Sequence, residues 1–416
     1  MKKLELLAPA GNPQKMATAY LYGADAVYLG IPDFSLRVRI NDFNLKSLKE
    51  AVIVAHQAKK KVYVTINIFA HNKHLKKLPA YLKILKDIKV DALIVSDPGV
   101  LSLTKKHCPK VPVHLSTQAN CTNLEAVKFW AKQGLARIIL GREVTLAEIK
   151  EIKKAVPKME LEYFVHGAMC MAYSGRCFLS KELVGRSGNL GDCAQPCRWP
   201  YEVMIKAEKH EDVFELVAEN HGTYLLNSKD LCLVKYLPEL IAAGVTSFKI
   251  EGRAKSIYYL ATIVGVYKAA LLEAEKLKGK RSSALSKKLN YYYNELNTKI
   301  INRGYTTGFL LKEKAAQNTS DSHNQVDWEF CGQVLAAADG LVLVKVHNTI
   351  LAGGNLEIIS PSYDIIKKKL TKFWDYKTKE EITEAHGGGG GQMIIFEESA
   401  QIPVGSVVRR QVIIKS

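Results

Sequence analysis

The stretch LEYFVHGAMCMAYSGRCFLSKELVGRSGNLGDCAQPC, Leu161 to Cys197, decides how the rest of the chain is interpreted. It begins with a short apolar run, Leu161 to Val165, that is typical of a buried strand and breaks at His166-Gly167. Half of the chain's 8 cysteines follow in one glycine-rich segment with the spacing C-x6-C-x15-C-x3-C: Cys170, Cys177, Cys193 and Cys197. We call residues 167–200 the cysteine loop, and its composition predicts a backbone that wraps a small inorganic group.

Three chemistries use four clustered cysteines: two disulfides, a structural zinc ion or an iron–sulfur cluster. The N-terminus has no apolar run typical of a signal peptide, so we expect a cytoplasmic protein whose thiols stay reduced. Structural zinc usually takes two close pairs, and only Cys193 and Cys197 have that spacing. Cluster ligands tolerate more varied spacing, so we expect a metal or cluster here, with Cys232 as an alternative to Cys197. The scattered Cys108, Cys121 and Cys331 are typical of ordinary buried thiols.

Working outward from this stretch, apolar runs of strand length alternate with stretches of helical periodicity. The runs are Leu4–Leu7, Ala26–Leu29, Val62–Ile66, Ala92–Val95, Val113–Leu115, Ile138–Leu140, Leu161–Val165 and Phe248–Ile250. This alternation predicts an α/β fold in which a parallel sheet closes into a TIM-type (β/α)8 barrel. An open doubly wound sheet is the alternative, but the turn APAGNP after the first run lacks the glycine-rich phosphate fingerprint of that fold.

The remaining sequence divides the chain into three parts. Residues 1–312 are expected to form the barrel, with the cysteine loop inside a long insertion between strands seven and eight. Residues 313–326 are polar and are predicted to be a linker. Residues 327–416 carry short alternating runs separated by turn signals, which predicts a small antiparallel β-barrel domain.

The charge and hydropathy of the chain limit the class of partner that we expect. The 416 residues include 59 Lys and Arg against 41 Asp and Glu, which gives a formal charge of +18. This excess favours a polyanion such as nucleic acid, although a generally lysine-rich proteome would produce the same excess. No apolar run approaches the ~20 residues needed to cross a bilayer, so we expect no membrane partner.

The run EYFVHGAMCMAYSGRCFLS, Glu162 to Ser180, resembles the signature of the U32 peptidase family, the collagenase-like peptidases. The blocks LLAPAGNP, YGADAVYLG, HLSTQAN, NSKDLC and SFKIEGR are similar to other blocks of that family. Within it, the chain most resembles the prephenate-dependent hydroxylases of the tRNA wobble uridine. The resemblance implies a [4Fe–4S] cluster, tRNA bound through its anticodon loop, prephenate as a small dicarboxylate co-substrate, and 5-hydroxyuridine as product.

In a barrel, functional side chains follow the strands at their carboxyl ends. The candidate catalytic residues found there are His166, Asp97, Gln118 and Glu251. The candidate substrate-binding residues, which suit carboxylates, phosphates or a base, are Arg37, Arg39, Asn67, Arg142, Lys249 and Arg253.

Two other functions compete with RNA hydroxylation. A peptidase is the activity in the family's name, and Cys170 with His166 is a conceivable nucleophile and base. The chain has neither H-E-x-x-H nor G-x-S-x-G, which argues against two common peptidase chemistries. An RNA-binding accessory subunit without turnover is the third possibility.

Overall fold

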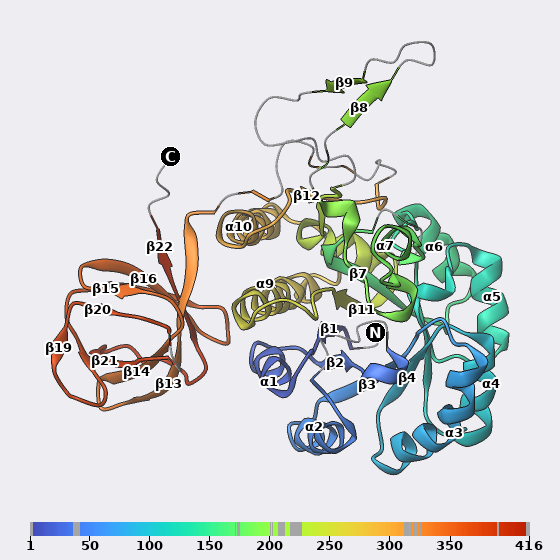
Figure 1. Ribbon diagram of the computed structural model, residues 1–416, viewed down its shortest axis with the longest axis horizontal. Helices are drawn as coiled ribbons and strands as arrows, with labels where there is room; N and C mark the ends of the chain where they lie inside the picture. Colours follow the sequence, from blue (N-terminus) through green and yellow to red (C-terminus); the bar gives the residue numbers. More distant parts are fainter. Residues whose placement is uncertain are drawn as a thin grey trace.

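The computed structural model describes residues 3–35, 42–170, 172, 175–199, 201, 203–206, 213–216, 227–311, 316, 318, 323–324, 326–388 and 391–412. Eight parallel strands form a closed ring, because β11 pairs with both β1 and β7. The ring is the large body in Figure 1, and it confirms the TIM-type barrel. Its strands are β1 (Glu5–Pro9), β2 (Ala26–Leu29), β3 (Lys61–Ile66), β4 (Ala92–Val95), β5 (Val113–Leu115), β6 (Arg137–Ile139), β7 (Glu160–Ala168) and β11 (Val245–Ile250).

The helices form an outer layer around the ring of strands. Several of them begin or end at residues that are suited to cap a helix. Asn44, Thr145 and Ser256 accept hydrogen bonds from the first turns of their helices, as N-caps do. Gly23 follows the first helix with φ +102°, a conformation that favours glycine and stops the helix. The helices are α1 (Pro13–Leu21), α2 (Leu45–Gln57), α3 (Asn72–Asp87), α4 (Pro98–His107), α5 (Leu124–Lys132), α6 (Leu146–Ala155), α8 (Leu237–Ala242), α9 (Ile257–Lys276) and α10 (Ser283–Lys299).

The long connection from β7 to β11 adds its own structure at the carboxyl end of the barrel. The cysteine loop contains α7 (Leu179–Val184) and the short 3-10 turns η5 (Gly188–Leu190) and η6 (Pro196–Arg198). A hairpin follows, formed by β8 (Val203–Lys206) and β9 (Val213–Leu216). The strand β10 (Asp230–Cys232) then pairs antiparallel with the end of β7, and β12 (Tyr305–Thr306) pairs with β10. These strands extend the sheet beside the barrel mouth.

The C-terminal part is an antiparallel sheet of eight strands around a second apolar core, as the sequence predicted for a β domain. It is the smaller body in Figure 1. The strands in sheet order are β17 (Ile365–Leu370), β16 (Gly354–Ile359), β22 (Val407–Gln411), β13 (Trp328–Ala338), β14 (Leu341–Val346), β21 (Met393–Glu397), β18 (Phe373–Asp375) and β19 (Glu381–Ile382). A short pair, β15 (Ile350–Leu351) and β20 (Glu384–Ala385), lies beside them. The exact division at residues 313–326 stays a prediction.

Buried polar contacts join the two parts. The fully buried Arg409 guanidinium on β22 lies 2.7 Å from the Glu295 carboxylate on α10 and 2.6 Å from Glu357 on β16. On the other side of the contact, the Tyr22 hydroxyl donates to the carbonyl of Ile359 at 2.8 Å. Breaking such a buried pair is costly, so these bonds hold the β domain against α10 and the end of α1.

Helix α9 corrects the expectation that no segment is long and apolar enough to cross a membrane. By length and composition alone it passes that test, and it is the one helix of the described residues that does. However, 72% of its most apolar window is buried inside the protein. Its side chains pack against the barrel and the neighbouring helices, as those of a core helix do.

Candidate functional site

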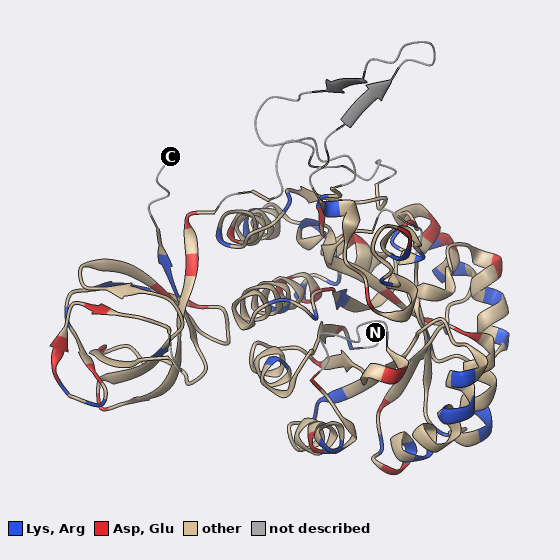
Figure 2. Cartoon of the chain, viewed as in Figure 1, with Lys and Arg blue, Asp and Glu red and all other residues tan. Residues whose placement is uncertain are grey.

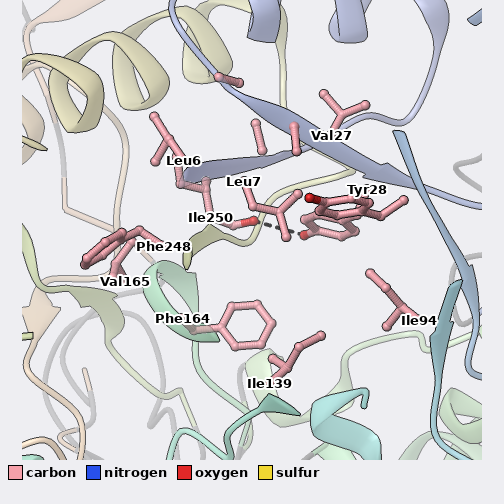
Figure 3. Close-up of a cluster of buried hydrophobic side chains, with 14 of the residues drawn as sticks. Leu6, Leu7, Val27, Tyr28, Ile94, Ile139, Phe164, Val165, Phe248 and Ile250 are labelled. Carbon is pink, nitrogen blue, oxygen red and sulfur yellow. Dashed lines mark hydrogen bonds between the residues drawn. The ribbon is translucent and has the colours of Figure 1, made fainter. Parts of the chain in front are cut away.

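The barrel mouth is built from side chains at the carboxyl ends of β2, β7 and β11. The Tyr28 hydroxyl donates to the Glu251 carboxylate at 2.9 Å and lies 3.0 Å from the carbonyl of Ile250. Figure 3 shows Tyr28 reaching across toward Ile250, with Phe164 on the facing wall. The Lys249 ammonium lies 4.4 Å from the centre of the Tyr28 ring and 5.4 Å from that of Phe164. Lys249 and Glu251 are thus brought together, as the barrel hypothesis required.

A second group of polar residues continues around the mouth. Arg253 is buried and donates to the Ser35 hydroxyl at 3.0 Å, and Ser35 lies 2.8 Å from the Thr65 hydroxyl. Next along the ring, the Asn67 amide lies 3.5 Å from the Ser116 hydroxyl. The mouth therefore carries Arg253 and Asn67 on one continuous rim. Arg37 and Arg39 lie outside the described residues.

Arg142 differs from the other cations of the mouth. Its guanidinium lies 3.8 Å from the centre of the Phe164 ring, a cation–π contact, and the side chain is half-buried. Within the described part of the chain, no carboxylate lies within ion-pair distance of it. A guanidinium held over an aromatic ring, with no carboxylate at ion-pair distance among the described residues, is suited to bind a carboxylate from a ligand.

Beneath the mouth, a layer of charged residues fills the barrel interior. The Lys249 ammonium lies 2.8 Å from the Glu162 carboxylate, and the Arg137 guanidinium lies 3.1 Å from the same carboxylate. Arg137 also pairs with Glu5, to which Tyr63 donates at 2.6 Å. Burial lowers the pKa of Lys249, whereas Glu162 opposes that change. Each charge of this floor has its partner within the chain.

His166 faces away from the mouth. The register of β7 against β11 shifts between Lys249 and Ile250, and this bulge places an extra residue on β7. The His166 ring consequently packs among Tyr259, Tyr267 and Tyr305 of the surrounding layers. Burial, aided by Lys255, lowers its pKa to about 3, so the ring is neutral at pH 7. The structure does not bring His166 together with the mouth residues, and its catalytic role stays a prediction.

Asp97 and Gln118 have different local roles. The Asp97 carboxylate accepts from the backbone N–H of Val100 at 2.9 Å and caps α4. The Gln118 carbonyl accepts from Arg176 of the cysteine loop at 2.6 Å. Its side-chain Oε1 is buried and has no hydrogen-bond partner in the described residues. Gln118 is thus the predicted catalytic residue that touches the cysteine loop, whereas Asp97 stabilises a helix.

The cysteine loop is attached to the rim of the mouth. Besides the Arg176 contact, the backbone N–H of Phe69, after β3, donates to the carbonyl of Asn189 at 3.3 Å. The Asn189 side chain accepts from the backbone N–H of Cys177 at 3.2 Å. Gly175 has φ +74°, and a Cβ there would lie 3.0 Å from the Gln118 amide nitrogen. Glycine is therefore needed where the loop meets the rim.

The four loop cysteines share one region. Burial raises the pKa of the Cys197 thiol, whereas Arg198 lowers it. The charges of Cys170, Cys193 and Cys177 raise it further, so these three thiols lie within electrostatic reach of Cys197. All are unbonded thiols, with Cys170 and Cys193 exposed and the other two half-buried. Thiolates gathered this way repel one another, and a cationic metal core would relieve that repulsion.

The surroundings of these sulfurs fit an iron–sulfur cluster. Backbone N–H groups of Leu179 and Gln195 donate to the sulfurs of Cys177 and Cys193 at 3.4 and 3.3 Å, a contact that tunes cluster thiolates. Among the described side chains, no three His, Cys, Asp or Glu residues are placed to hold a single metal ion. A core of several irons and sulfides is larger than one ion and holds its thiolates farther apart.

Cys232 lies elsewhere. It is buried on β10 opposite His166, and the Tyr267 hydroxyl is 3.8 Å from its sulfur. Burial raises its pKa to about 11, and the charges of Lys235 and Asp230 act on it. Cys197 lies in the same loop as Cys170, Cys177 and Cys193, whereas Cys232 lies on β10, and the choice between the two as fourth ligand stays a prediction.

Sequence reasoning missed several residues of this site. Tyr28, Arg176 and Asn189 were not singled out, although all three connect predicted site residues. The charged floor was missed as well, and here a signal existed. Glu5 and Glu162 interrupt apolar strands at positions where an inward-facing apolar residue is expected, which indicates buried partners.

The sequence matches the profile of peptidase family U32 over residues 11–320 and that of the U32 C-terminal domain over residues 326–409. It is 39% identical to "tRNA hydroxylation protein P" of Escherichia coli over 88% of each chain. It is 35% identical to the "23S rRNA 5-hydroxycytidine C2501 synthase" of the same organism, over 86% of this chain and 52% of that protein. It is 31% identical to "Collagenase" of Porphyromonas gingivalis, over 91% and 92%. The chain belongs to peptidase family U32.

Proposed function

We propose that this protein is a tRNA hydroxylase that uses prephenate to form 5-hydroxyuridine at the wobble position. The relatives named for tRNA and rRNA hydroxylation support RNA modification as the class of reaction. The observation that carries the proposal is the attachment of the cysteine loop, with its four free thiols, to the rim of the barrel mouth. We assign to Cys170, Cys177, Cys193 and Cys197 a [4Fe–4S] cluster, which would supply redox chemistry when bound.

The residues of the mouth fit the two substrates. The Arg142 guanidinium suits a carboxylate of prephenate, because a planar fork pairs well with two oxygens. Arg253 lies farther around the rim, where a second carboxylate or an RNA phosphate would meet it. A wobble base is unpaired in the anticodon loop, so it enters the mouth without the cost of opening a duplex.

The chain also provides a proton acceptor. Replacing the hydrogen at C5 of uridine by a hydroxyl group is a two-electron oxidation. With water as the oxygen source it would release two protons, one of them from C5, and two electrons that the redox group assigned above would accept. Glu251 is the carboxylate at the mouth, and Tyr28 fixes its position through a hydrogen bond. Lys249 beside it is paired with Glu162 and provides positive charge near the reacting base. Glu251 would take the proton, and Lys249 would stabilise negative charge that develops on the base.

Peptidase activity has less support from the site. A thiol nucleophile needs an adjacent base, and burial among tyrosines lowers the pKa of His166 to about 3, which makes it a weak proton acceptor. Within the described residues no hydrogen bond joins Cys170 to His166. Peptidase activity, which the name of the collagenase relative suggests, is an alternative that the test below includes.

The test is reconstitution of the reaction. Anaerobically purified protein is incubated with unmodified tRNA, with and without prephenate, and the nucleosides are analysed by mass spectrometry. We expect 5-hydroxyuridine only with prephenate, and at least a tenfold loss of product in Arg142→Leu. Product formed equally well without prephenate would contradict the co-substrate. No product from the purified protein, with loss of the modification in a deletion strain, would favour an accessory subunit. Cleavage of gelatin or casein, abolished by Cys170→Ser, would favour a peptidase.

A further inference from the structure

A separate pocket of about 330 Å³ lies beside the barrel mouth. Its walls come from the turn η1 (Pro32–Phe34) after β2, from the first two turns of α3, and from Leu190 in η5 of the cysteine loop. None of the predicted site residues that the structure describes lines it. The pocket therefore needs its own explanation.

One wall of the pocket is cationic. Lys73 and Lys77 lie one turn apart on α3, so both ammonium groups reach the same side of the helix. Figure 2 shows Lys and Arg repeated along α3 on the outside of the barrel. The first turn of α3 carries no acidic residue, so the helix end adds to the positive potential. This wall suits a phosphate.

His74 adds a neutral donor to the same wall. Its Nδ1 accepts from the backbone N–H of His71 at 2.9 Å, so the ring proton of the neutral form is on Nε2. Burial and the neighbouring Lys73 lower the pKa of His74, which keeps the ring neutral at pH 7. Asp33 lines the pocket as well and supplies a carboxylate, which accepts hydrogen bonds from hydroxyl or amino groups.

The remaining lining is apolar. Phe34, Ile68 and Leu190 contribute hydrocarbon surface, and the Phe34 ring is itself stacked on Tyr81 with centroids 4.7 Å apart. A ligand that fits has an anionic end, a flat apolar part, and hydroxyl or amino groups for Asp33. A nucleotide has all three, whereas a dicarboxylate would be repelled by Asp33.

The pocket is adjacent to the mouth along the backbone. Phe34 precedes Ser35, which binds Arg253, and Ile68 follows Asn67, which contacts Ser116. The two segments are joined, because the backbone N–H of Asn67 donates to the carbonyl of Phe34 at 3.1 Å. A ligand in the mouth and a ligand in the pocket are therefore separated by one layer of backbone.

We propose that this pocket binds the nucleotide next to the modified uridine, with its phosphate on Lys73 and Lys77 and its base against Phe34, Ile68 and Leu190. The inference rests on the proposed function, and it names a subsite for the RNA. Leu190 makes the cysteine loop part of this subsite, so the loop that carries the four thiols also helps to place the RNA.

The test compares two double variants of the full-length, iron-loaded protein. Lys73→Ala/Lys77→Ala removes the cationic wall, and Lys76→Ala/Lys83→Ala removes the same charge from α3 at exposed positions that do not line the pocket. Binding of a fluorescent anticodon stem–loop is measured by anisotropy at several salt concentrations. We expect the pocket variant to bind at least tenfold more weakly, with a salt slope smaller by about one. We expect the control variant to stay within about twofold of wild type, because Lys76 and Lys83 do not line the pocket and salt screens their charges from an RNA bound there. Equal losses in both variants would overturn the subsite.

Chemically modified RNA identifies the phosphate that Lys73 and Lys77 contact. Neutral methylphosphonate linkages are placed, one at a time, on either side of the wobble uridine. At one position we expect a loss of affinity for wild type that matches the loss caused by the lysine substitutions, and no further loss in the pocket variant. Additive losses at both positions would show that the lysines do not touch these phosphates and would overturn the proposal.

This binding assay is independent of turnover. Coupling between the lysines and one linkage, with no 5-hydroxyuridine formed, would uphold the pocket and reject the hydroxylase. Product formation without this coupling would uphold the hydroxylase and reject the pocket. If the pocket variant instead raises the KM for prephenate and leaves RNA binding unchanged, the site takes a small carboxylate and the proposal fails.

Discussion

The floor of the barrel and the cysteine loop are two groups of ionisable residues at opposite ends of the site. In the floor, Glu162 is bonded to both Arg137 and Lys249, so each charge has a partner in the chain. In the loop, Cys170 and Cys193 are exposed thiols whose neighbours are other thiols and backbone N–H groups. The charges of the floor are paired within the polypeptide, whereas we propose that the thiols of the loop bind a cluster. We therefore expect changes in the floor to affect folding and changes in the loop to affect cofactor and activity.

The largest effect is expected in the loop. Cys193→Ala removes one of the four proposed ligands and should lower hydroxylation of tRNA at least a hundredfold, with little change in unfolding free energy. Cys232→Ala is the matched control, because that thiol is buried on β10, outside the cysteine loop. Product is measured by mass spectrometry of nucleosides. Similar losses in the two variants would mean that Cys232 also belongs to the cofactor site.

The next effect is expected in the floor. Glu162→Gln leaves Arg137 and Lys249 buried without their shared carboxylate and should reduce the free energy of unfolding by about 3–5 kcal/mol. Glu125→Gln removes an exposed partner of Lys128 and should cost only about 0–1 kcal/mol. Urea denaturation measures both, and the iron content of folded Glu162→Gln should equal that of wild type. A cost below 1 kcal/mol for Glu162→Gln would contradict the account of the floor.

The floor also has a pH signature. His114 lies against Tyr63, and burial, followed by Arg137, lowers its pKa to about 3. Because its pKa in the folded protein is depressed, its contribution to stability is full above about pH 6.5 and is lost as the pH falls toward 3. Between pH 7 and pH 5, His114→Phe should therefore lose about 1–2 kcal/mol less unfolding free energy than wild type does. An identical pH dependence in the two proteins would show that His114 does not titrate on unfolding in this range.

The smallest effect is expected for substitutions of Asp97, which distinguish a residue that caps a helix from one that takes part in catalysis. Asp97→Ala should cost about 1 kcal/mol of unfolding free energy, because α4 loses its N-cap, with turnover unchanged. Asp97→Asn keeps a capping oxygen and should be near wild type in stability. A large loss of turnover in the Asn variant would instead support the catalytic role that the sequence predicted for Asp97.

The barrel could be predicted from the sequence because each strand is marked by a short apolar run. Ala26–Leu29 and Ala92–Val95 coincide with β2 and β4, and the signal is strong because both faces of a barrel strand are buried. The position of the cysteines after β7 was equally readable. Lys249 and Glu251 were expected at the mouth from strand order alone, and the structure brings them together there.

The direction of single side chains could not be predicted in the same way. His166 was expected at the mouth, but a bulge between β7 and β11 turns it toward the tyrosines of α9. Asp97 stands directly before Pro98, where a cap and a catalyst look alike in sequence. The pocket of Lys73 and Lys77 arises from segments that are distant along the chain, which no local pattern reveals.

The most direct test of the proposed cluster is the iron and sulfide content of anaerobically purified protein, taken with its absorption spectrum. We expect about four irons and four sulfides per chain. Replacing Cys170, Cys177, Cys193 and Cys197 together should abolish both while the barrel stays folded. Zinc in place of iron, or iron that survives the fourfold replacement, would contradict the cluster.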